Sequence, residues 1–140
     1  MKTINVRMVV DVVGALEADT LAGHLYMIDD NRLGGSRDQA TAALATATTP
    51  GDRIIWTLLP IECETHAAIG AIELPAQICE VRRETYPGSD ICYWVGLVKQ
   101  PVGDLLYGLT LELGSRTRTL NKGADARLIN AALQASHDAT

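Results

Sequence analysis

Pro50-Gly51-Asp52-Arg53-Ile54-Ile55-Trp56-Thr57-Leu58 combines a tight turn with the start of a buried strand. Proline presets φ and glycine tolerates positive φ, so Pro50-Gly51-Asp52 is typical of a turn. The run that follows is rich in Ile, Trp and Thr, which favour a strand buried on at least one face. Trp56 is the largest apolar side chain of that run. We therefore expect this strand at the centre of a β-core.

Other segments on both sides of this strand also have strand patterns. From Thr3 to Val12, apolar and polar residues alternate, and a period of two predicts a half-buried strand. Tyr86-Pro87-Gly88-Ser89-Asp90 predicts the turn of a hairpin. Within residues 65–74, Gly70 indicates close packing or a bulge. The remaining strands are predicted over residues 24–28, 40–49, 65–74, 78–85, 91–98, 105–113 and 115–120.

The end of the chain has a different pattern. Leu128, Ile129, Ala132 and Leu133 fall on one helical face, which predicts a short C-terminal helix over residues 124–135. Short strands with turns at roughly ten-residue spacing indicate a β-sandwich or a barrel. We expect an all-β fold, a β-sandwich of antiparallel strands with that helix, as a single domain over residues 1–140.

Composition excludes several classes of partner. The chain of 140 residues has a formal net charge of −5, which argues against binding to nucleic acid or an anionic membrane. It contains no apolar run of the roughly 18 residues that a membrane helix needs. Cys63, Cys79 and Cys92 are an odd number without CxxC spacing, which favours reduced thiols over a disulfide or an intermolecular bridge. We predict a cytoplasmic protein.

A family resemblance rests on four short motifs in a fixed order. The motifs are Tyr26-Met27-Ile28, Gly34-Gly35-Ser36, Thr41-Ala42-Ala43-Leu44 and Pro50-Gly51-Asp52-Arg53-Ile54-Ile55-Trp56. In this order the chain resembles the bacterial PixA/AidA group, the inclusion body protein family. The similarity runs from about Ile4 to Ile69 and returns at Tyr93 to Leu113. Where the family closes on a Trp-Asp-Pro segment, this chain has Ala124-Asp125-Ala126.

The resemblance implies a β-sandwich without established enzymatic activity. The group is tied to quorum-regulated expression or to abundant intracellular protein deposits, and its molecular role is poorly defined. We therefore expect a non-enzymatic, self-associating protein, a homo-oligomer without a cofactor. The alternative is a lectin-like module that binds a glycan or another small molecule.

The residues of a ligand site for that alternative lie in two predicted loops. Asp29, Asp30 and Asn31 offer the hard oxygen ligands that suit Ca²⁺, but they lack the ligand spacing of a calcium loop. We interpret them as a solvated turn at a strand end, because Asp and Asn favour turns for backbone reasons alone, and we predict no metal site. Tyr86 and Asp90 belong to the hairpin turn, where an aromatic ring can stack on a sugar or a peptide.

A cysteine-dependent enzyme is a second alternative. Glu62-Cys63-Glu64-Thr65-His66 brings a thiol, carboxylates and an imidazole together in sequence. A nucleophilic cysteine needs a base aligned by tertiary contacts, and no spacing here supplies one. We interpret the segment as a polar connection and predict no catalytic residue. Arg82-Arg83, and Arg116 with Arg118, are interpreted as solvated strand faces rather than an anion site.

Overall fold

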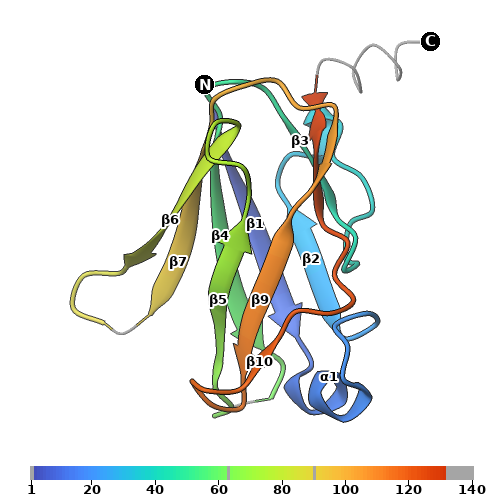
Figure 1. The fold of residues 1–140 in the computed structure, drawn as a ribbon, viewed down its shortest axis with the longest axis vertical. Coiled ribbons are helices and arrows are strands. Elements are labelled where there is room, and N and C mark those ends of the chain that lie inside the picture. Colours follow the sequence, from blue (N-terminus) through green and yellow to red (C-terminus); the bar gives the residue numbers. More distant parts are fainter. Residues whose placement is uncertain (1, 63, 90, 132–140) are drawn as a thin grey trace.

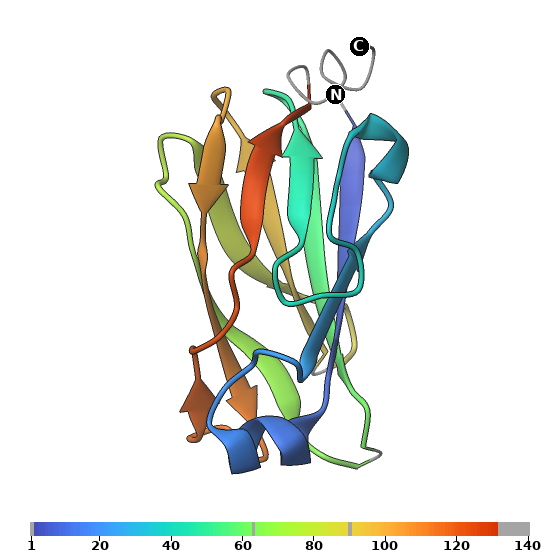
Figure 2. The ribbon, with the colours of Figure 1, turned by 90° about the vertical axis from the view of Figure 1, so that its right-hand side faces the viewer.

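A computed structural model describes residues 2–62, 64–89 and 91–131 of the chain. Its strands run mainly along the long axis of the molecule, with the one α-helix of the described residues at one end (Figures 1 and 2). The elements are β1 (Thr3–Val10), α1 (Val12–Ala18), β2 (Leu25–Asp29), η1 (Arg32–Gly34), β3 (Ala45–Thr48), β4 (Arg53–Pro60), β5 (Ala67–Glu73), β6 (Cys79–Thr85), β7 (Cys92–Val98), β8 (Asp104–Leu106), β9 (Gly108–Leu113), β10 (Thr119–Leu120) and β11 (Arg127–Asn130).

The largest sheet has five strands in the order β2-β1-β4-β7-β6. The predicted central strand is confirmed: β4 is the middle strand, and Trp56 is completely buried. The predicted hairpin is also confirmed, because β6 and β7 pair from Cys79 with Val98 to Thr85 with Cys92. This hairpin projects from the body of the molecule (Figure 1).

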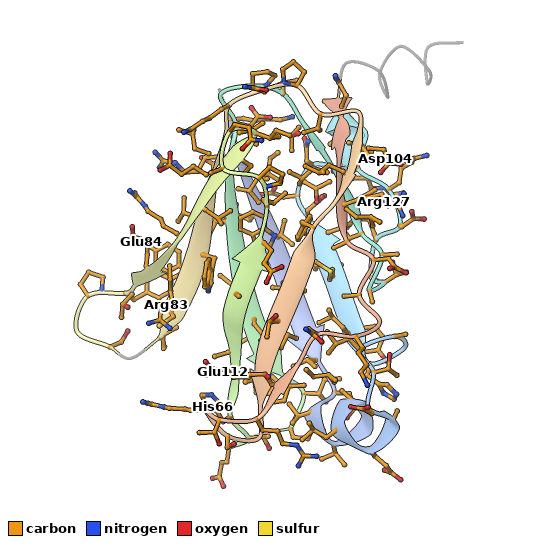
Figure 3. All side chains as sticks on the ribbon, viewed as in Figure 1. His66, Arg83, Glu84, Asp104, Glu112 and Arg127 are labelled. Carbon is orange, nitrogen blue, oxygen red and sulfur yellow. The ribbon has the colours of Figure 1, made fainter. Side chains whose placement is uncertain are left out.

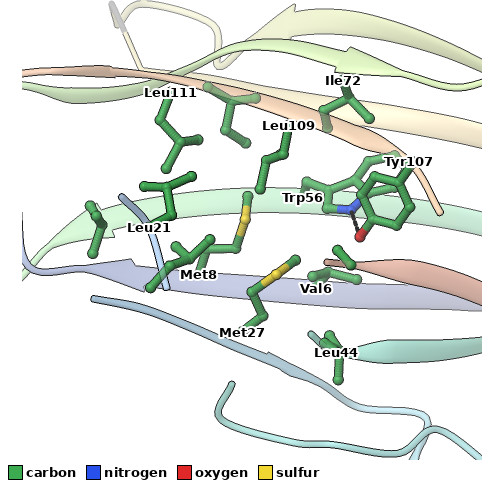
Figure 4. Close-up of a cluster of buried hydrophobic side chains, with 14 of the residues drawn as sticks. Val6, Met8, Leu21, Met27, Leu44, Trp56, Ile72, Tyr107, Leu109 and Leu111 are labelled. Atoms are coloured by element: carbon green, nitrogen blue, oxygen red, sulfur yellow. Dashed lines mark hydrogen bonds between the residues drawn. The ribbon is translucent and has the colours of Figure 1, made fainter. Parts of the chain in front are cut away.

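Two three-stranded sheets, β10-β9-β5 and β3-β11-β8, complete the fold. Side chains of β5 and β9 face those of β1, β2 and β4 across a hydrophobic core (Figure 4). Ile72 and Leu111 lie on one side of this core, and Met8, Met27 and Trp56 lie on the other. The expected all-β class is therefore confirmed. No helix in the described ranges is long and apolar enough to cross a membrane.

The turn at residues 50–52 is confirmed in detail. Gly51 has a φ of 96°, and its N–H donates to the carbonyl of Val98 at 2.7 Å. The Asp52 carboxylate is buried and accepts hydrogen bonds from the backbone N–H and the hydroxyl of Thr49 at 2.9 and 3.2 Å. It also accepts the backbone N–H of Lys2 at 3.3 Å. A buried carboxylate needs such partners, and this one joins the start of β1 to the start of β4.

The expectation that the strands pair only antiparallel is wrong. β1 pairs with β4 in parallel, from Thr3 with Arg53 to Val10 with Pro60, and β3 pairs with β11 in parallel. A parallel pair needs a long crossover connection. The segment between β1 and β4 is long enough, because it contains α1, β2, η1 and β3.

The helix predicted over residues 124–135 does not form over residues 124–130. Residues Arg127–Asn130 form β11, and residues 132–135 lie outside the described residues. Leu128 and Ile129 are both buried, although they point to opposite faces of the strand. β11 lies between β3 and β8, and an ion pair at 3.0 Å joins Arg127 of β11 to Asp104 of β8 (Figure 3).

Other strand boundaries also differ from the prediction. β1 ends at Val10, because Val12 begins α1, and the segment 115–120 forms a strand only over β10. The segment 40–49 forms a strand only over β3, and Ala40, at its start, has a positive φ of 66°. The segment 105–113 divides at Tyr107 into β8 and β9, which belong to different sheets. The bulge expected at Gly70 is confirmed by a shift of register between Ile69 and Ala71.

Candidate functional site

The face of the five-stranded sheet that points away from the core is open to solvent. Along β1, Ile4, Val6, Met8 and Val10 are buried, so the residues between them point outward. We call this surface the outer face. Its exposed apolar side chains include Tyr26, Ile28 and Leu97, with exposed fractions of 41%, 43% and 42%.

A hollow of about 290 Å³ lies on the outer face. Its central part follows from the strand register, because Arg7 of β1 lies opposite Thr57 of β4. The rings of Tyr86 and Tyr93 lie 4.5 Å apart with a tilt of 39° and form one wall. The complete lining is Asn5, Arg7, Ile55, Thr57, Tyr86 and Tyr93.

The side chains of this hollow offer groups that can contact a ligand. The guanidinium of Arg7 has no carboxylate partner among the described residues, so it can donate to a bound molecule. Asn5 and Thr57 add an amide and a hydroxyl, and the two tyrosines offer ring faces. Aromatic rings beside a few fixed polar groups are typical of small-molecule sites.

The structure separates the three predicted residues of the first loop. Asp30 supports the hollow, because its carboxylate accepts hydrogen bonds from the backbone N–H of Asn5 at 2.9 Å and from its side-chain amide at 2.8 Å. Asp29 accepts from the Gln39 amide at 2.9 Å, and Asn31 is buried. These two side chains therefore have structural roles.

Asn31 illustrates such a structural role. Its amide nitrogen donates to the carbonyl of Ala47 at 2.6 Å, and its amide oxygen accepts from the Lys2 ammonium at 2.6 Å. Within residues 2–62, 64–89 and 91–131, no group of three or more His, Cys, Asp or Glu side chains is placed to hold a metal ion.

The predicted residues of the second loop have different outcomes. Tyr86 lines the hollow, and its binding role stays a prediction. Asp90 lies outside the described residues. Of the predicted residues, only Tyr86 lines the hollow, and Asp30 is linked to it through its hydrogen bonds to Asn5. Sequence reasoning missed the other lining residues, among them Asn5 and Arg7.

The residues of the cysteine-dependent alternative are only partly described. Cys63 lies outside the described residues. His66 Nε2 lies 3.1 Å from Glu112 Oε1 of β9 (Figure 3). Burial raises the pKa of the Cys79 thiol to about 11, so this thiol is protonated at neutral pH.

Sequence reasoning also missed a second concave region, beside the β6–β7 hairpin. It is lined in part by Arg83 and Arg116, which are distant in sequence, together with His66 and Glu112. Because side chains alternate along a strand, Arg82 and Arg83 lie on opposite faces of β6. This alternation was the sequence signal that could have assigned the two arginines to different surfaces. Only the tertiary fold brings Arg83 and Arg116 together.

The fold places the chain in a known class of all-β proteins. It is similar to the crystal structure of an inclusion body protein, PixA, from Burkholderia cenocepacia J2315, with a TM-score of 0.67 and 14% sequence identity. The similarity covers 92% of this chain and 94% of that chain. The fold is therefore PixA-like, as the sequence resemblance predicted.

A family model of the sequence, independent of the structural similarity, identifies the family of this chain. The chain belongs to the family described as a domain of unknown function, DUF8788, which it matches over residues 2–119. No curated protein matches the chain.

Proposed function

We propose that this chain is a non-enzymatic β-sandwich protein that self-associates through its outer face. The observation that supports the proposal best is the set of exposed apolar side chains on that face, among them Tyr26, Ile28 and Leu97. The similar structure is that of an inclusion body protein, and a protein of that kind associates with itself. The cytoplasmic location expected from the sequence belongs to the same proposal.

The distribution of charge favours a second copy of this chain as the binding partner of the outer face. The outer face carries four basic side chains and three acidic ones, whereas the whole chain has a net charge of −5. Two copies therefore meet there without the like-charge repulsion that other faces of the protein impose. The charged side chains are Arg7, Arg53, Arg82, Lys99, Asp30, Glu80 and Glu84.

The outer face is a better candidate for the self-association surface than the edge of the same sheet. The edge strand β6 carries Glu80, Arg82 and Glu84, and charged side chains on an edge disfavour pairing with another chain. Arg82 is paired with Glu84 at 2.7 Å, and Lys99 with Glu80 at 2.8 Å. The Lys99 hydrogen bond lowers the pKa of Glu80, which keeps this edge charged.

Light scattering coupled to size-exclusion chromatography tests the proposal across a series of protein concentrations. We expect a defined oligomer whose dissociation constant rises at least tenfold in Ile28→Lys and in Leu97→Lys. Leu33→Lys and Leu106→Lys are matched controls, because both leucines are exposed but lie off the outer face. A monomer at all concentrations, or equal effects in all four variants, would contradict the proposal.

The hollow favours a carbohydrate-binding module as the second candidate. The observation behind it is the Tyr86–Tyr93 pair beside Asn5, Arg7 and Thr57, because sugars bind through ring stacking and hydrogen bonds to hydroxyl groups. A ligand there would occupy the same face as a second copy, so the two functions compete.

A glycan array with and without Ca²⁺ tests this candidate. We expect signals that Tyr86→Ala abolishes and that Tyr26→Ala retains, because Tyr26 is exposed on the same face but does not line the hollow. If the array gives no signal either with or without Ca²⁺, the carbohydrate-binding function is excluded.

A further inference from the structure

A cleft runs between the β6–β7 hairpin and the sheet that contains β5 and β9. It consists of two adjoining hollows of about 290 and 330 Å³, and these sizes lie near the lower end of the range for small-molecule sites. We call it the lateral cleft. His66 and Glu112 lie on one wall and Arg83 on the other (Figure 3). The two hollows share His66, Ala68, Ile69, Cys92 and Arg116.

The first hollow is basic. Arg83 and Arg116 line it, and neither guanidinium has an ion-pair partner among the described residues. By contrast, the neighbouring Arg82 is paired with Glu84 on the other face of β6. Glu112 is the acidic residue of the lining, and its Oε1 lies 3.1 Å from His66 Nε2. Two unpaired guanidinium groups that face one cleft are a binding arrangement for an anion.

The second hollow is lined mainly by apolar side chains. Leu58, Leu59, Pro60 and Ile91 extend the cleft beyond the arginines. Ile91 is 64% exposed, which is a large fraction for an isoleucine and indicates a surface that a ligand can cover. Burial of such a surface under an apolar chain is favourable, at about 25 cal/mol per Å² of apolar area.

The walls of the cleft are joined by a fixed contact. The Trp94 indole of β7 donates a hydrogen bond from Nε1 to the carbonyl of Ile69 on β5, at 3.1 Å. Ile69 lies beside the bulge of β5 and lines both hollows. The contact holds the hairpin at a set distance from β5, so the cleft is present before a ligand binds, which lowers the entropic cost of binding.

We propose that the lateral cleft binds a small amphipathic anion. The anionic head, a carboxylate or a phosphate, lies between Arg83 and Arg116, and an alkyl chain lies in the hollow formed by Leu58, Pro60 and Ile91. Arg83 of this site lies on the face of β6 opposite the outer face, and the proposal does not depend on self-association or on glycan binding.

Isothermal titration calorimetry with sodium octanoate, below its micelle concentration, tests the proposal on the full chain. Octyl phosphate is the second arm and identifies the preferred head group. We expect binding of at least one of them, with a dissociation constant at least tenfold weaker in Arg83→Gln and in Arg116→Gln. Arg82→Gln and Arg118→Gln are matched controls, because neither arginine lines the cleft, and both should bind as the parent does.

Two further comparisons distinguish the contribution of the anionic head group to the affinity from that of the alkyl chain. Octanol should bind at least tenfold more weakly than octanoate, and inorganic phosphate more weakly than octyl phosphate. Ile91→Ser should weaken octanoate binding, whereas Ile61→Ser, at an exposed position outside the cleft, should not. Absence of binding by both amphiphiles overturns the proposal. Equal affinity for octanol and octanoate, or equal losses in the arginine variants and their controls, also overturns it.

Discussion

The Trp56 indole donates a hydrogen bond from Nε1 to the hydroxyl of Tyr107, at 3.2 Å, and both residues are buried in the core. Their ring centroids lie 5.9 Å apart in an edge-on arrangement with an angle of 66°. Burial raises the pKa of Tyr107 far above its ordinary value, so the hydroxyl stays protonated. The pair joins the central strand β4 to the residue that separates β8 from β9 (Figure 4).

Tyr107→Phe should lower the free energy of unfolding by about 1–3 kcal/mol, because it leaves the buried indole N–H of Trp56 without a partner. Urea unfolding followed by fluorescence measures the change. Tyr26→Phe is the matched control, since its hydroxyl bonds the carbonyl of Gly23 on the exposed surface. Equal unfolding midpoints for Tyr107→Phe and the parent would show that the hydrogen bond does not stabilise the core.

Gly96→Ala should destabilise the protein by about 1–3 kcal/mol, the usual cost of overpacking a core. A Cβ atom at Gly96 would lie 2.8 and 2.9 Å from Cζ3 and Cη2 of Trp56, and 3.0 Å from the Cys79 sulfur. The buried indole cannot move aside easily. Gly103→Ala meets no atom within 4 Å and is the control for thermal melting. If the melting temperatures of Gly96→Ala and Gly103→Ala were equal, the close packing of Trp56 against Gly96 would be contradicted.

Asp11→Ala should destabilise α1 in a pH-dependent way. Asp11 is the N-cap of this helix, and the hydrogen bond from the Gly14 N–H lowers its pKa below the ordinary value of 3.8, with further contributions from Glu62 and His24. Because the folded-state pKa is lowered, the carboxylate stabilises the protein above pH 3.8 and loses this effect as pH falls through the folded-state pKa.

The free energy of unfolding should therefore differ between Asp11→Ala and the parent at pH 7 and pH 5, and this difference should shrink below pH 3.8. Urea titrations at each pH measure it. Asp11→Asn keeps a capping oxygen without the charge, so its own stability should lack this pH-dependent component. A difference that stays constant from pH 7 to pH 2 would exclude the role of the charge.

Cys79 should resist alkylation in the folded protein. Its side chain is buried, and burial raises the pKa of the thiol to about 11, so the reactive thiolate is scarce at pH 7.5. Iodoacetamide labelling followed by mass spectrometry should modify Cys79 only after unfolding in urea. Rapid labelling of Cys79 in the folded protein would show that this part of the core opens readily.

The features of the fold that depend on local sequence were predictable. Pro50, Gly51 and Asp52 specify their turn by conformational preference, and β1 shows a period of two because one of its faces is open to solvent. β11 lacks such a signal, because Leu128 and Ile129 are buried on opposite faces. A short apolar run of this kind does not distinguish a strand from a helix, and tertiary contacts decided the outcome.

The candidate sites were predictable only in part, for the same reason. Tyr86 has a local signal, since it adjoins a Pro-Gly turn. Its neighbours in the hollow, Asn5 and Thr57, come from two other strands, and their position follows from the parallel pairing of β1 with β4. Arg83 and Arg116 likewise share the lateral cleft through sheet packing, which no short motif encodes.

The position of β11 between β3 and β8 also bears on how the chain is made. Residue 45 of β3 pairs with residue 127, so on the ribosome β3 emerges long before its partner is synthesised. Until then, the backbone groups of β3 that will bond to β11 are open to other nascent chains, and unpaired strand edges promote aggregation. We therefore expect a chain truncated before β11 to aggregate more readily than the complete chain.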